Sequence, residues 1–143
     1  MKMLNKEDCK ICVVGMGYVG LPLAARFALK GFSVTGFDIN EERINQLTNL
    51  IDINSDIADK NLEILVKNSK LTSQINEIKD NNIYIITVPT PINEDKTPDL
   101  NPLISCSELI GSIMKKDSIV IYESTVYPGV TDEICTPILE EKS

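Results

Sequence analysis

The sequence predicts an α/β fold in which a parallel sheet carries helices on both faces. Short β-branched runs alternate along the chain with segments of helical apolar spacing. Three of the runs, at 13–14, 83–86 and 119–122, are almost entirely apolar, which is typical of strands covered by helices on both sides. The chain has 143 residues, 43% of them hydrophobic, so we expect one domain over residues 1–143 with an ordinary core.

The first elements follow from local pattern and stop signals. Residues 10–14 form a β-branched run, which predicts a strand. Residues 21–29 place apolar side chains at helical spacing and end at a Lys-Gly stop signal. Residues 32–37 predict a second strand, which Asp38 closes.

The middle of the chain continues the alternation. Asn40 is the expected N-cap of a helix over 41–50. Residues 55–68 predict another helix, and residues 71–75 a short strand. The apolar run at 83–88 predicts a further strand of the parallel sheet.

The last third completes the pattern. A Pro in the first turn begins a helix over 101–115, and a strand is expected at 118–123. Residues 131–141 predict a final helix, in which Pro137 causes a break or kink. The loop 89–100 is rich in Pro and acids, follows a strand, and is long enough to be functional.

Composition and charge exclude several function classes. Fourteen Lys and Arg oppose 21 Asp and Glu, a net charge of -7, so we expect no nucleic-acid partner. Apolar runs of about five residues are far shorter than a membrane span, and the N-terminus lacks the apolar core of a signal peptide. We therefore expect a cytoplasmic protein with no membrane partner. The absence of His excludes an imidazole base or a His-ligated metal on this chain.

The four cysteines are Cys9, Cys12, Cys106 and Cys135, and the first two form a C-x-x-C pair. This spacing invites a redox or zinc interpretation. However, Cys12 lies in an expected strand, where residues three apart face opposite sides. No second pair completes a zinc site, so we expect ordinary packed or surface thiols and no metal.

The motif that carries chemistry is G-x-G-x-x-G, formed by Gly15, Gly17 and Gly20. It follows a strand and opens a helix, and the next strand ends in an acid, Asp38, 18 residues beyond Gly20. This is the context of the Rossmann dinucleotide fingerprint. Gly15 would allow a tight turn, Gly17 a close approach of a pyrophosphate, and Gly20 close packing of helix on strand. The positive helix end would hold the phosphates, although a tight turn without ligand is the alternative.

Two residues after the second strand bear on the choice of dinucleotide. Asp38 stands where a carboxylate accepts both ribose hydroxyls, and it would repel a 2′-phosphate, so NAD is expected rather than NADP. Arg43 could lie over the adenine. It could also counter Asp38, or pair with Glu41 or Glu42 on an exposed helix.

Two polar clusters follow strands and belong to the same edge of the expected sheet. Residues 87–91 read TVPTP, and residues 123–129 read ESTVYPG. Since ligands bind outside the carboxyl ends of parallel strands, these hydroxyls and prolines would form rigid walls beside a cofactor. Turn formation alone also favours Thr, Ser, Pro and Gly, and remains an alternative.

Together these segments resemble the UDP-glucose/GDP-mannose dehydrogenase family. The stretch ICVVGMGYVGLPL at 11–23 is similar to its NAD fingerprint, VPTP at 88–91 with PDL at 98–100 to its second landmark, and STV with PG at 124–129 to its third. Residues 122–135 most resemble the branch that oxidises UDP-N-acetylhexosamines, such as the Vi-polysaccharide UDP-N-acetylglucosamine 6-dehydrogenase type. Glu123 stands where other branches tend to carry a basic residue.

The resemblance implies a set of roles. The family oxidises a sugar 6-hydroxyl to a carboxylate in two NAD-dependent hydride transfers, through a Cys thioester, and full-length members are expected to be homodimers. Thr125 would be the catalytic residue, orienting the hydrolytic water near the nicotinamide. Expected to contact or line the cofactor are Gly15, Gly17, Tyr18, Val19, Gly20, Asp38, Arg43, Thr87, Thr90 and Ser124.

The sequence departs from the family in one major respect. The Gly-rich stretch with the nucleophilic Cys is absent, as are the sugar-nucleotide domain and the long dimerisation helix. The chain therefore resembles the NAD-binding domain, and we expect it to bind NAD without turnover, the UDP-sugar requiring the missing domain. Two other classes remain open at this point: a cofactor domain of another dehydrogenase, such as the hydroxyacid or 6-phosphogluconate type, and a non-catalytic nucleotide sensor.

Overall fold

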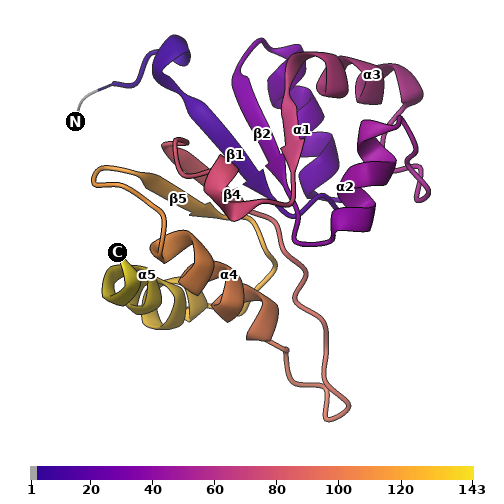
Figure 1. Cartoon of the computed structure of the whole chain (residues 1–143). Helices are drawn as coiled ribbons and strands as arrows, with labels where there is room; N and C mark the ends of the chain where they lie inside the picture. Colours follow the sequence, from indigo (N-terminus) through magenta and orange to yellow (C-terminus); the bar gives the residue numbers. More distant parts are fainter. Residues whose placement is uncertain (1–2) are drawn as a thin grey trace.

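A computed structural model describes residues 3–143 and shows a parallel sheet between two layers of helices (Figure 1). The sheet has five strands in the order β3-β2-β1-β4-β5, all paired in parallel. The strands are β1 (Lys10–Val14), β2 (Ser33–Phe37), β3 (Lys70–Thr72), β4 (Ile83–Ile86) and β5 (Ile119–Tyr122). The helices are α1 (Gly20–Leu29), α2 (Glu41–Thr48), α3 (Asp59–Asn68), α4 (Asn101–Gly111) and α5 (Thr136–Lys142).

The core lies in two apolar layers, one on each face of the sheet. Ile11, Val13 and Ile85 face one way and pack with α1, α2 and α3. Cys12 and Tyr84 face the other way, toward α4 and α5. The central strands β1 and β4 are therefore covered on both sides, which explains their nearly uninterrupted apolar sequences. The expectation that the strand at 119–122 is also covered on both sides was wrong, because Ile119 and Ile121 of β5 are exposed on one face. The predicted α/β fold, a parallel sheet with helices on both faces, is confirmed, and the sheet is doubly wound in the Rossmann manner.

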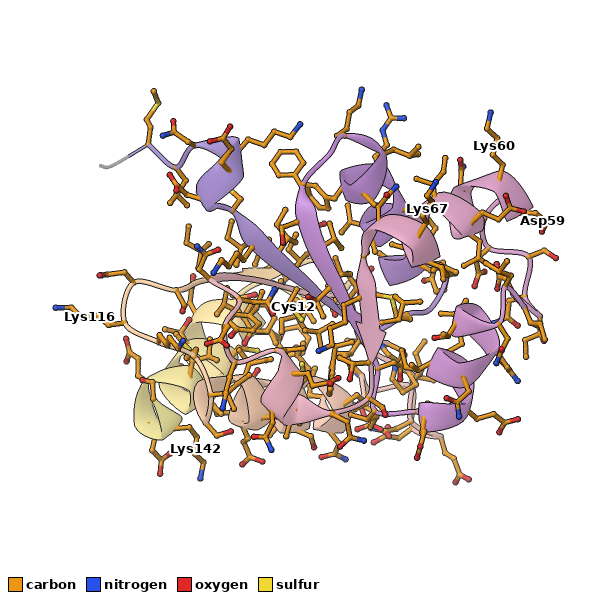
Figure 2. All side chains as sticks on the ribbon, turned by 45° about the horizontal axis from the view of Figure 1, so that its top comes forward. Cys12, Asp59, Lys60, Lys67, Lys116 and Lys142 are labelled. Carbon is orange, nitrogen blue, oxygen red and sulfur yellow. The ribbon has the colours of Figure 1, made fainter. Side chains whose placement is uncertain are left out.

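The C-x-x-C pair divides between these two layers. Cys9 packs in the layer under α1, whereas Cys12 packs in the layer under α4 and α5. All four cysteines are free and buried (Figure 2 labels Cys12 in the centre of the sheet). The strand geometry that separates residues three apart thus holds, and the two thiols do not converge on one site.

Several predicted boundaries were wrong. The strand expected at 71–75 is Lys70–Thr72, followed by a short 3-10 turn, η2 (Ile75–Glu77). The Thr72 hydroxyl accepts the N–H of Gln74 at 3.0 Å, and this side chain to backbone bond ends the strand. The first strand has the predicted bounds, 10–14. The strands expected at 32–37, 83–88 and 118–123 and the helix expected at 101–115 are each shorter than predicted, because element ends depend on such local bonds.

The helix expected at 55–68 begins only at Asp59. The residues before it form a loop around Asp52. The Asp52 carboxylate accepts the N–H groups of Asp56 and Ile57 at 2.6 and 3.2 Å, which holds those residues outside the helix. The loop places Asp52 and Asp56 next to Arg43, which in turn bonds to Met16 in the turn after β1.

The final helix is interrupted as predicted. Residues Thr131–Cys135 form a π-helical turn, η3, and α5 follows with Pro137 in its first turn. Because Pro137 has no N–H, the regular hydrogen-bond pattern cannot continue through it. The Thr136 hydroxyl instead donates to the carbonyl oxygen of Thr131 at 3.0 Å. Within residues 3–143, no helix has the length and apolar character needed to cross a bilayer.

Candidate functional site

The glycine-rich turn joins β1 to α1, and each glycine meets a different requirement. Gly15 has φ of +101°, a conformation that side chains disfavour. A Cβ atom at Gly20 would lie 1.7 Å from the Gly15 carbonyl oxygen and 2.4 Å from Thr87 Oγ1. A Cβ at Gly17 would meet nothing within 4 Å. The turn is therefore packed tightly on its inner side and open at Gly17, where another molecule can approach its backbone.

The open side of the turn offers unpaired hydrogen-bond donors. Among residues 3–143, the N–H groups of Gly17, Tyr18 and Val19 have no acceptor, and Val19 provides no side-chain cap for α1. The ten-residue helix α1 adds its positive dipole end at the same place. Together, the free N–H groups and the dipole favour an anion such as a pyrophosphate, without any lysine.

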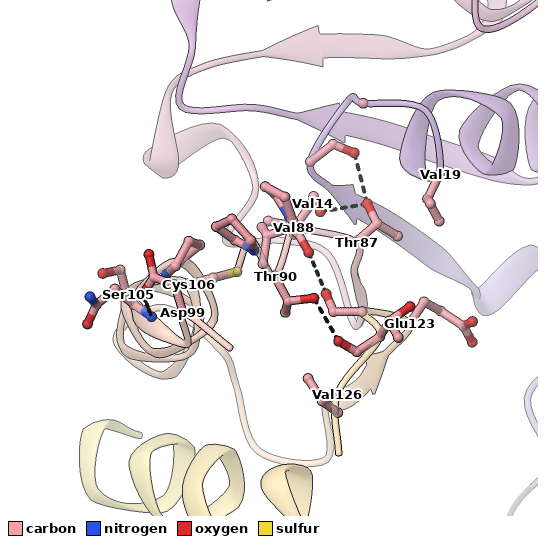
Figure 3. A pocket seen from close by; sticks show the side chains of 18 of the residues that line it. Val14, Val19, Thr87, Val88, Thr90, Asp99, Ser105, Cys106, Glu123 and Val126 are labelled. Atoms are coloured by element: carbon pink, nitrogen blue, oxygen red, sulfur yellow. Dashed lines mark hydrogen bonds between the residues drawn. The ribbon is translucent and has the colours of Figure 1, made fainter. Parts of the chain in front are cut away.

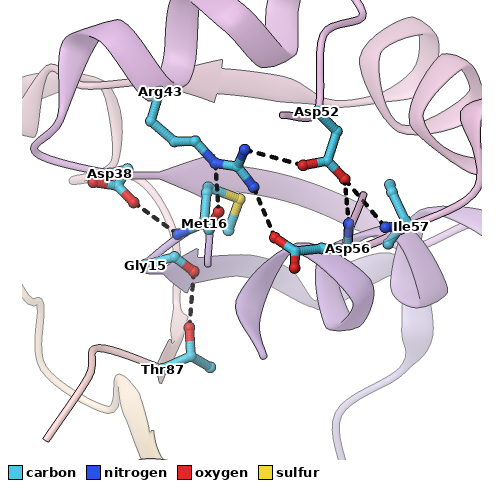
Figure 4. A network of polar contacts seen from close by, with 8 residues as sticks. All are labelled: Gly15, Met16, Asp38, Arg43, Asp52, Asp56, Ile57 and Thr87. Atoms are coloured by element: carbon cyan, nitrogen blue, oxygen red, sulfur yellow. Dashed lines mark hydrogen bonds and ion pairs between the residues drawn. The ribbon is translucent and has the colours of Figure 1, made fainter. Parts of the chain in front are cut away.

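Asp38, at the carboxyl end of β2, is held by backbone bonds on both oxygens. Oδ2 accepts the N–H of Met16 at 2.9 Å (Figure 4). Oδ1 accepts the N–H of Asn40 at 2.9 Å. Each oxygen keeps a second acceptor position. The carboxylate is thus fixed beside the turn with capacity to accept two hydroxyl groups.

Within residues 3–143, Arg43 forms no ion pair with Asp38, Glu41 or Glu42, so the two interpretations that gave it these partners were wrong. Its Nε donates to the carbonyl oxygen of Met16 at 2.9 Å. Its two terminal nitrogens pair with Asp52 and Asp56, each at 3.1 Å (Figure 4). The Arg43 side chain is 9% exposed, so the guanidinium is a buried support of the turn.

The hydrogen bonds and the ion pair of the Asp52 carboxyl favour its ionised form. Burial raises its pKa, but the N–H of Ile57, the Arg43 guanidinium and the N–H of Asp56 outweigh burial and keep the pKa below its ordinary value of 3.8. Asp52 is therefore ionised at neutral pH and neutralises part of the Arg43 charge.

A cavity of about 1200 Å³ runs along the carboxyl ends of β1, β2, β4 and β5, on both sides of the point where the strand order reverses (Figure 3). This is where ligands bind in open α/β sheets. Nine of the residues predicted from the sequence line this cavity: Gly15, Gly17, Tyr18, Val19, Asp38, Thr87, Thr90, Ser124 and Thr125. Gly20 and Arg43 are not among the lining residues; Gly20 is buried at the start of α1, and Arg43 is buried against the turn.

Hydroxyl groups in the segments after β4 and β5 hold the loops around the cavity together by hydrogen bonds. Thr87 Oγ1 lies 2.8 Å from the carbonyl oxygen of Val14 and 2.9 Å from that of Gly15. Thr90 donates to the carbonyl oxygen of Thr125 at 2.7 Å, and Ser124 donates to that of Val88 at 2.7 Å. The segments after β4 and β5 are thus joined directly. Thr125 is exposed, and it lines the cavity beside these joined segments.

Sequence reasoning missed Asp52 and Asp56. Both lie in a loop without helical or strand periodicity, and an acidic residue in such a loop is usually solvated. It also missed Asp99, Asn101 and Ser105, which line the cavity from the start of α4 and the loop before it. Two signals pointed to this part of the cavity wall: the Pro- and acid-rich composition of the loop at 89–100, and the PDL stretch at 98–100, which resembles a landmark of the family.

Comparisons with known proteins agree with this geometry. A family model described as "UDP-glucose/GDP-mannose dehydrogenase family, NAD binding domain" matches residues 9–143. The chain is 50% identical over 141 residues to a UDP-N-acetyl-D-glucosamine 6-dehydrogenase of Salmonella typhi, covering 99% of the chain and 33% of that protein. It is 50% identical over 137 residues to the same enzyme of Pseudomonas aeruginosa, covering 96% of the chain and 32% of the relative.

A solved structure shows the same arrangement. UDP-D-ManNAc dehydrogenase of Pyrococcus horikoshii superimposes with a TM-score of 0.85 at 34% identity, covering 92% of the chain and 32% of that structure. The chain thus spans about a third of the length of the proteins that it resembles.

Proposed function

Because the chain belongs to the UDP-glucose/GDP-mannose dehydrogenase family, as its NAD-binding domain, we propose that its glycine-rich turn and Asp38 bind NAD for the oxidation of a UDP-N-acetylhexosamine at C6. The observation that carries this proposal is the open face at Gly17, where free N–H groups meet an empty volume next to a fixed carboxylate.

In this pose the pyrophosphate lies on the N–H groups of Gly17 and its neighbours, at the start of α1. The adenosine ribose donates its hydroxyl groups to Asp38, whose oxygens are oriented by the N–H groups of Met16 and Asn40. The nicotinamide half extends along the cavity toward Thr90, Ser124 and Thr125. When bound, NAD supplies the hydride acceptor; the chain binds and orients it.

Thr125 is the one residue of this chain proposed to act directly in the reaction. The bond from Thr90 to its carbonyl oxygen fixes its backbone, while its side chain borders the cavity. A hydroxyl in this place can hold a water molecule for hydrolysis of an acyl intermediate. The proposed role is to orient that water, which places Thr125 at the nicotinamide end.

The proposed substrate is UDP-N-acetylglucosamine, since two relatives of that activity share half of the aligned residues. The complete protein would make the uronic acid in two NAD-dependent steps, for polysaccharide synthesis, as a homodimer. The 143-residue chain by itself binds NAD without turnover, because its four cysteines are all buried in the two core layers or at their margins. Cys106 borders the cavity, but it is only 8% exposed and burial raises the pKa of its thiol to about 12, so it is not an activated nucleophile.

Thermal unfolding of the 143-residue chain with NAD, NADP or ATP tests the cofactor assignment. NAD at 100 times its dissociation constant adds about 2.7 kcal/mol to the free energy of unfolding. That corresponds to a rise in Tm of roughly 5–10 °C for a domain of this size. NADP and ATP should stabilise less. No shift with NAD would overturn the proposal, and an equal shift with NADP would remove the role given to Asp38.

A second measurement tests whether the isolated chain binds NAD without catalysing the reaction. Incubation of the isolated chain with NAD and UDP-N-acetylglucosamine should give no increase in NADH absorbance. Steady NADH production would show that the chain carries a complete catalytic site and would contradict the assignment as a cofactor domain.

A further inference from the structure

The guanidinium of Arg43 stands behind the proposed adenosine site, next to the carboxylate that would bind the ribose. Both side chains hold the same residue: Asp38 accepts the Met16 N–H, and Arg43 donates to the Met16 carbonyl oxygen. An arginine in this region of a dinucleotide site is the usual partner of a 2′-phosphate. Arg43 lies five residues after Asp38 in the sequence. If Asp38 were absent and Arg43 were free, Arg43 could therefore bind the 2′-phosphate of NADP.

The structure shows that this arginine is already engaged on all three of its nitrogens. Nε bonds to Met16, while the two terminal nitrogens bond to Asp52 Oδ1 and Asp56 Oδ2, each at 3.1 Å. The side chains of Arg43, Asp52 and Asp56 are 9%, 4% and 11% exposed. Buried pairs of this kind do not rearrange cheaply, because separating them leaves a charge without a partner.

Asp52 is itself held in place by the backbone of its own loop. Its Oδ2 accepts the N–H groups of Asp56 and Ile57, while Oδ1 faces Arg43. The carboxylate therefore cannot follow the guanidinium if Arg43 turns outward. The same N–H bonds hold the Asp52 pKa below its ordinary value, so the carboxylate keeps its charge at neutral pH.

The charge of the cluster opposes a 2′-phosphate. One guanidinium and two carboxylates leave a net charge of about -1, and Asp38 adds a further negative charge on the other side of Met16. A free arginine here would instead present a positive charge and a planar pair of donors, which suit a phosphate.

We propose that Asp52 and Asp56 are specificity-determining residues, which exclude 2′-phosphorylated dinucleotides by confining and neutralising Arg43. This inference rests on the proposed dinucleotide site and assigns to the loop before α3 a role that the fingerprint does not contain. Asp38 repels a 2′-phosphate directly. Asp52 and Asp56 hold Arg43 in place, so Arg43 cannot bind a 2′-phosphate even when Asp38 is replaced.

The experiment compares dissociation constants for NAD and NADP, by calorimetry, in four forms of the 143-residue chain: wild type, D38S, D52N/D56N and D38S/D52N/D56N. Asn preserves the size and one acceptor oxygen of Asp, so these changes remove charge with little loss of packing. D38S alone should weaken NAD and leave NADP weak. The triple variant should bind NADP at least tenfold more tightly than D38S does, and the gain should decrease with added salt.

Arg43→Gln in the triple variant is the matched control, and it should abolish the gain in NADP affinity. Unfolding in urea verifies that each variant is folded. If D52N/D56N does not fold, D56N in the D38S background leaves a smaller but measurable gain, because it removes one of the two charges.

The outcomes separate this inference from the proposed function. If wild type binds no NAD, the dinucleotide site itself is wrong. If wild type binds NAD but the triple variant binds NADP no better than D38S, Asp52 and Asp56 are structural only, and the inference fails. Tight NADP binding by D38S alone would also overturn it, since Arg43 would then be free to contact the 2′-phosphate without release from its two acids.

Discussion

The main chain of Gly15 lies so close to Gly20 that a Cβ atom on Gly20 would come within 1.7 Å of the Gly15 carbonyl oxygen. This contact presses the first turn of α1 against the end of β1. It sets the angle at which the helix leaves the turn, and so the direction of the free N–H groups of Gly17, Tyr18 and Val19. The same space is closed from the other side by Thr87 Oγ1, which bonds to Gly15.

Gly20→Ala should therefore destabilise the protein and disrupt the site. The added methyl group meets backbone rather than a flexible side chain, so the turn itself must move. Overpacking of this kind costs about 1–3 kcal/mol or more. We expect a lower midpoint in urea unfolding and loss of the thermal shift with NAD. An unchanged midpoint would show that the turn adjusts freely.

Gly17→Ala is expected to separate binding from stability. A Cβ at this position meets nothing within 4 Å, so the free energy of unfolding measured in urea should stay within about 0.5 kcal/mol of wild type, as for most surface changes. The methyl group would stand where a pyrophosphate approaches the backbone, so NAD affinity measured by calorimetry should fall at least tenfold. Retained affinity would move the phosphates elsewhere.

Asp52→Asn should reduce stability in a pH-dependent way. The folded-state pKa of Asp52 lies below its ordinary value of 3.8, so its carboxylate contributes stability above about pH 4. The contribution is lost as the pH falls through the folded pKa. The difference in urea midpoint between wild type and variant should be constant from pH 7 to 5 and shrink below pH 4. The exposed Asp132→Asn serves as control, and a difference that grows in acid would contradict this linkage.

The buried thiols should be unreactive in the native protein. Burial raises the pKa of Cys106 to about 12 and that of Cys12 well above its usual value of 9, and neighbouring thiols add to both shifts. Since the thiolate is the reactive form, labelling by a disulfide reagent at pH 8 should be at least 100-fold slower than in the unfolded chain. Mass spectrometry of the labelled protein identifies the sites. Rapid native labelling of either residue would disprove this expectation.

The edge strand β5 should make the 143-residue chain self-associate. Alternate side chains, Val120 and Tyr122, pack toward α4, whereas Ile119 and Ile121 are 41% and 38% exposed on the other face. Within residues 3–143, β5 has one strand neighbour, β4, so its outer backbone edge is open. Open edges with apolar side chains promote pairing between molecules.

I119K/I121K should reduce this association, as seen in the concentration dependence of mass from light scattering. I53K is the matched control, because Ile53 is 66% exposed but lies in the loop between α2 and α3. A wild-type chain that stays monomeric at all concentrations would contradict the prediction. So would an equal effect of I53K, which would indicate a nonspecific loss of hydrophobicity.

Much of the fold and the turn could be predicted because the relevant signals are contiguous. Strand β1, the three glycines and Asp38 lie within 29 residues, at spacings that β-to-α geometry imposes. Apolar runs correctly indicated that β1 and β4 are covered on both faces, but the same inference was wrong for β5, whose Ile119 and Ile121 are exposed on one face. Element ends were less predictable, because each depends on a particular side chain to backbone bond, such as that between Thr72 and Gln74.

The partners of Arg43 could not be predicted from the sequence. Asp52 and Asp56 are nine and thirteen residues away, in a loop with no period, and the nearer acids Glu41 and Glu42 were the obvious choices. The bond between Thr90 and Thr125 spans 35 residues and joins two loops after different strands. Neither contact has a local sequence signal.

The sequence alone thus predicted the parallel sheet, the glycine-rich turn and the acid at the end of β2. These features follow from steric rules that act over short stretches of chain. Which side chains converge on that turn depended on how the α2–α3 loop and the segments after β4 and β5 fold back against it. Burial is the physical reason: removed from water, the Arg43 charge needs partners, and the folded chain supplies them from Asp52 and Asp56.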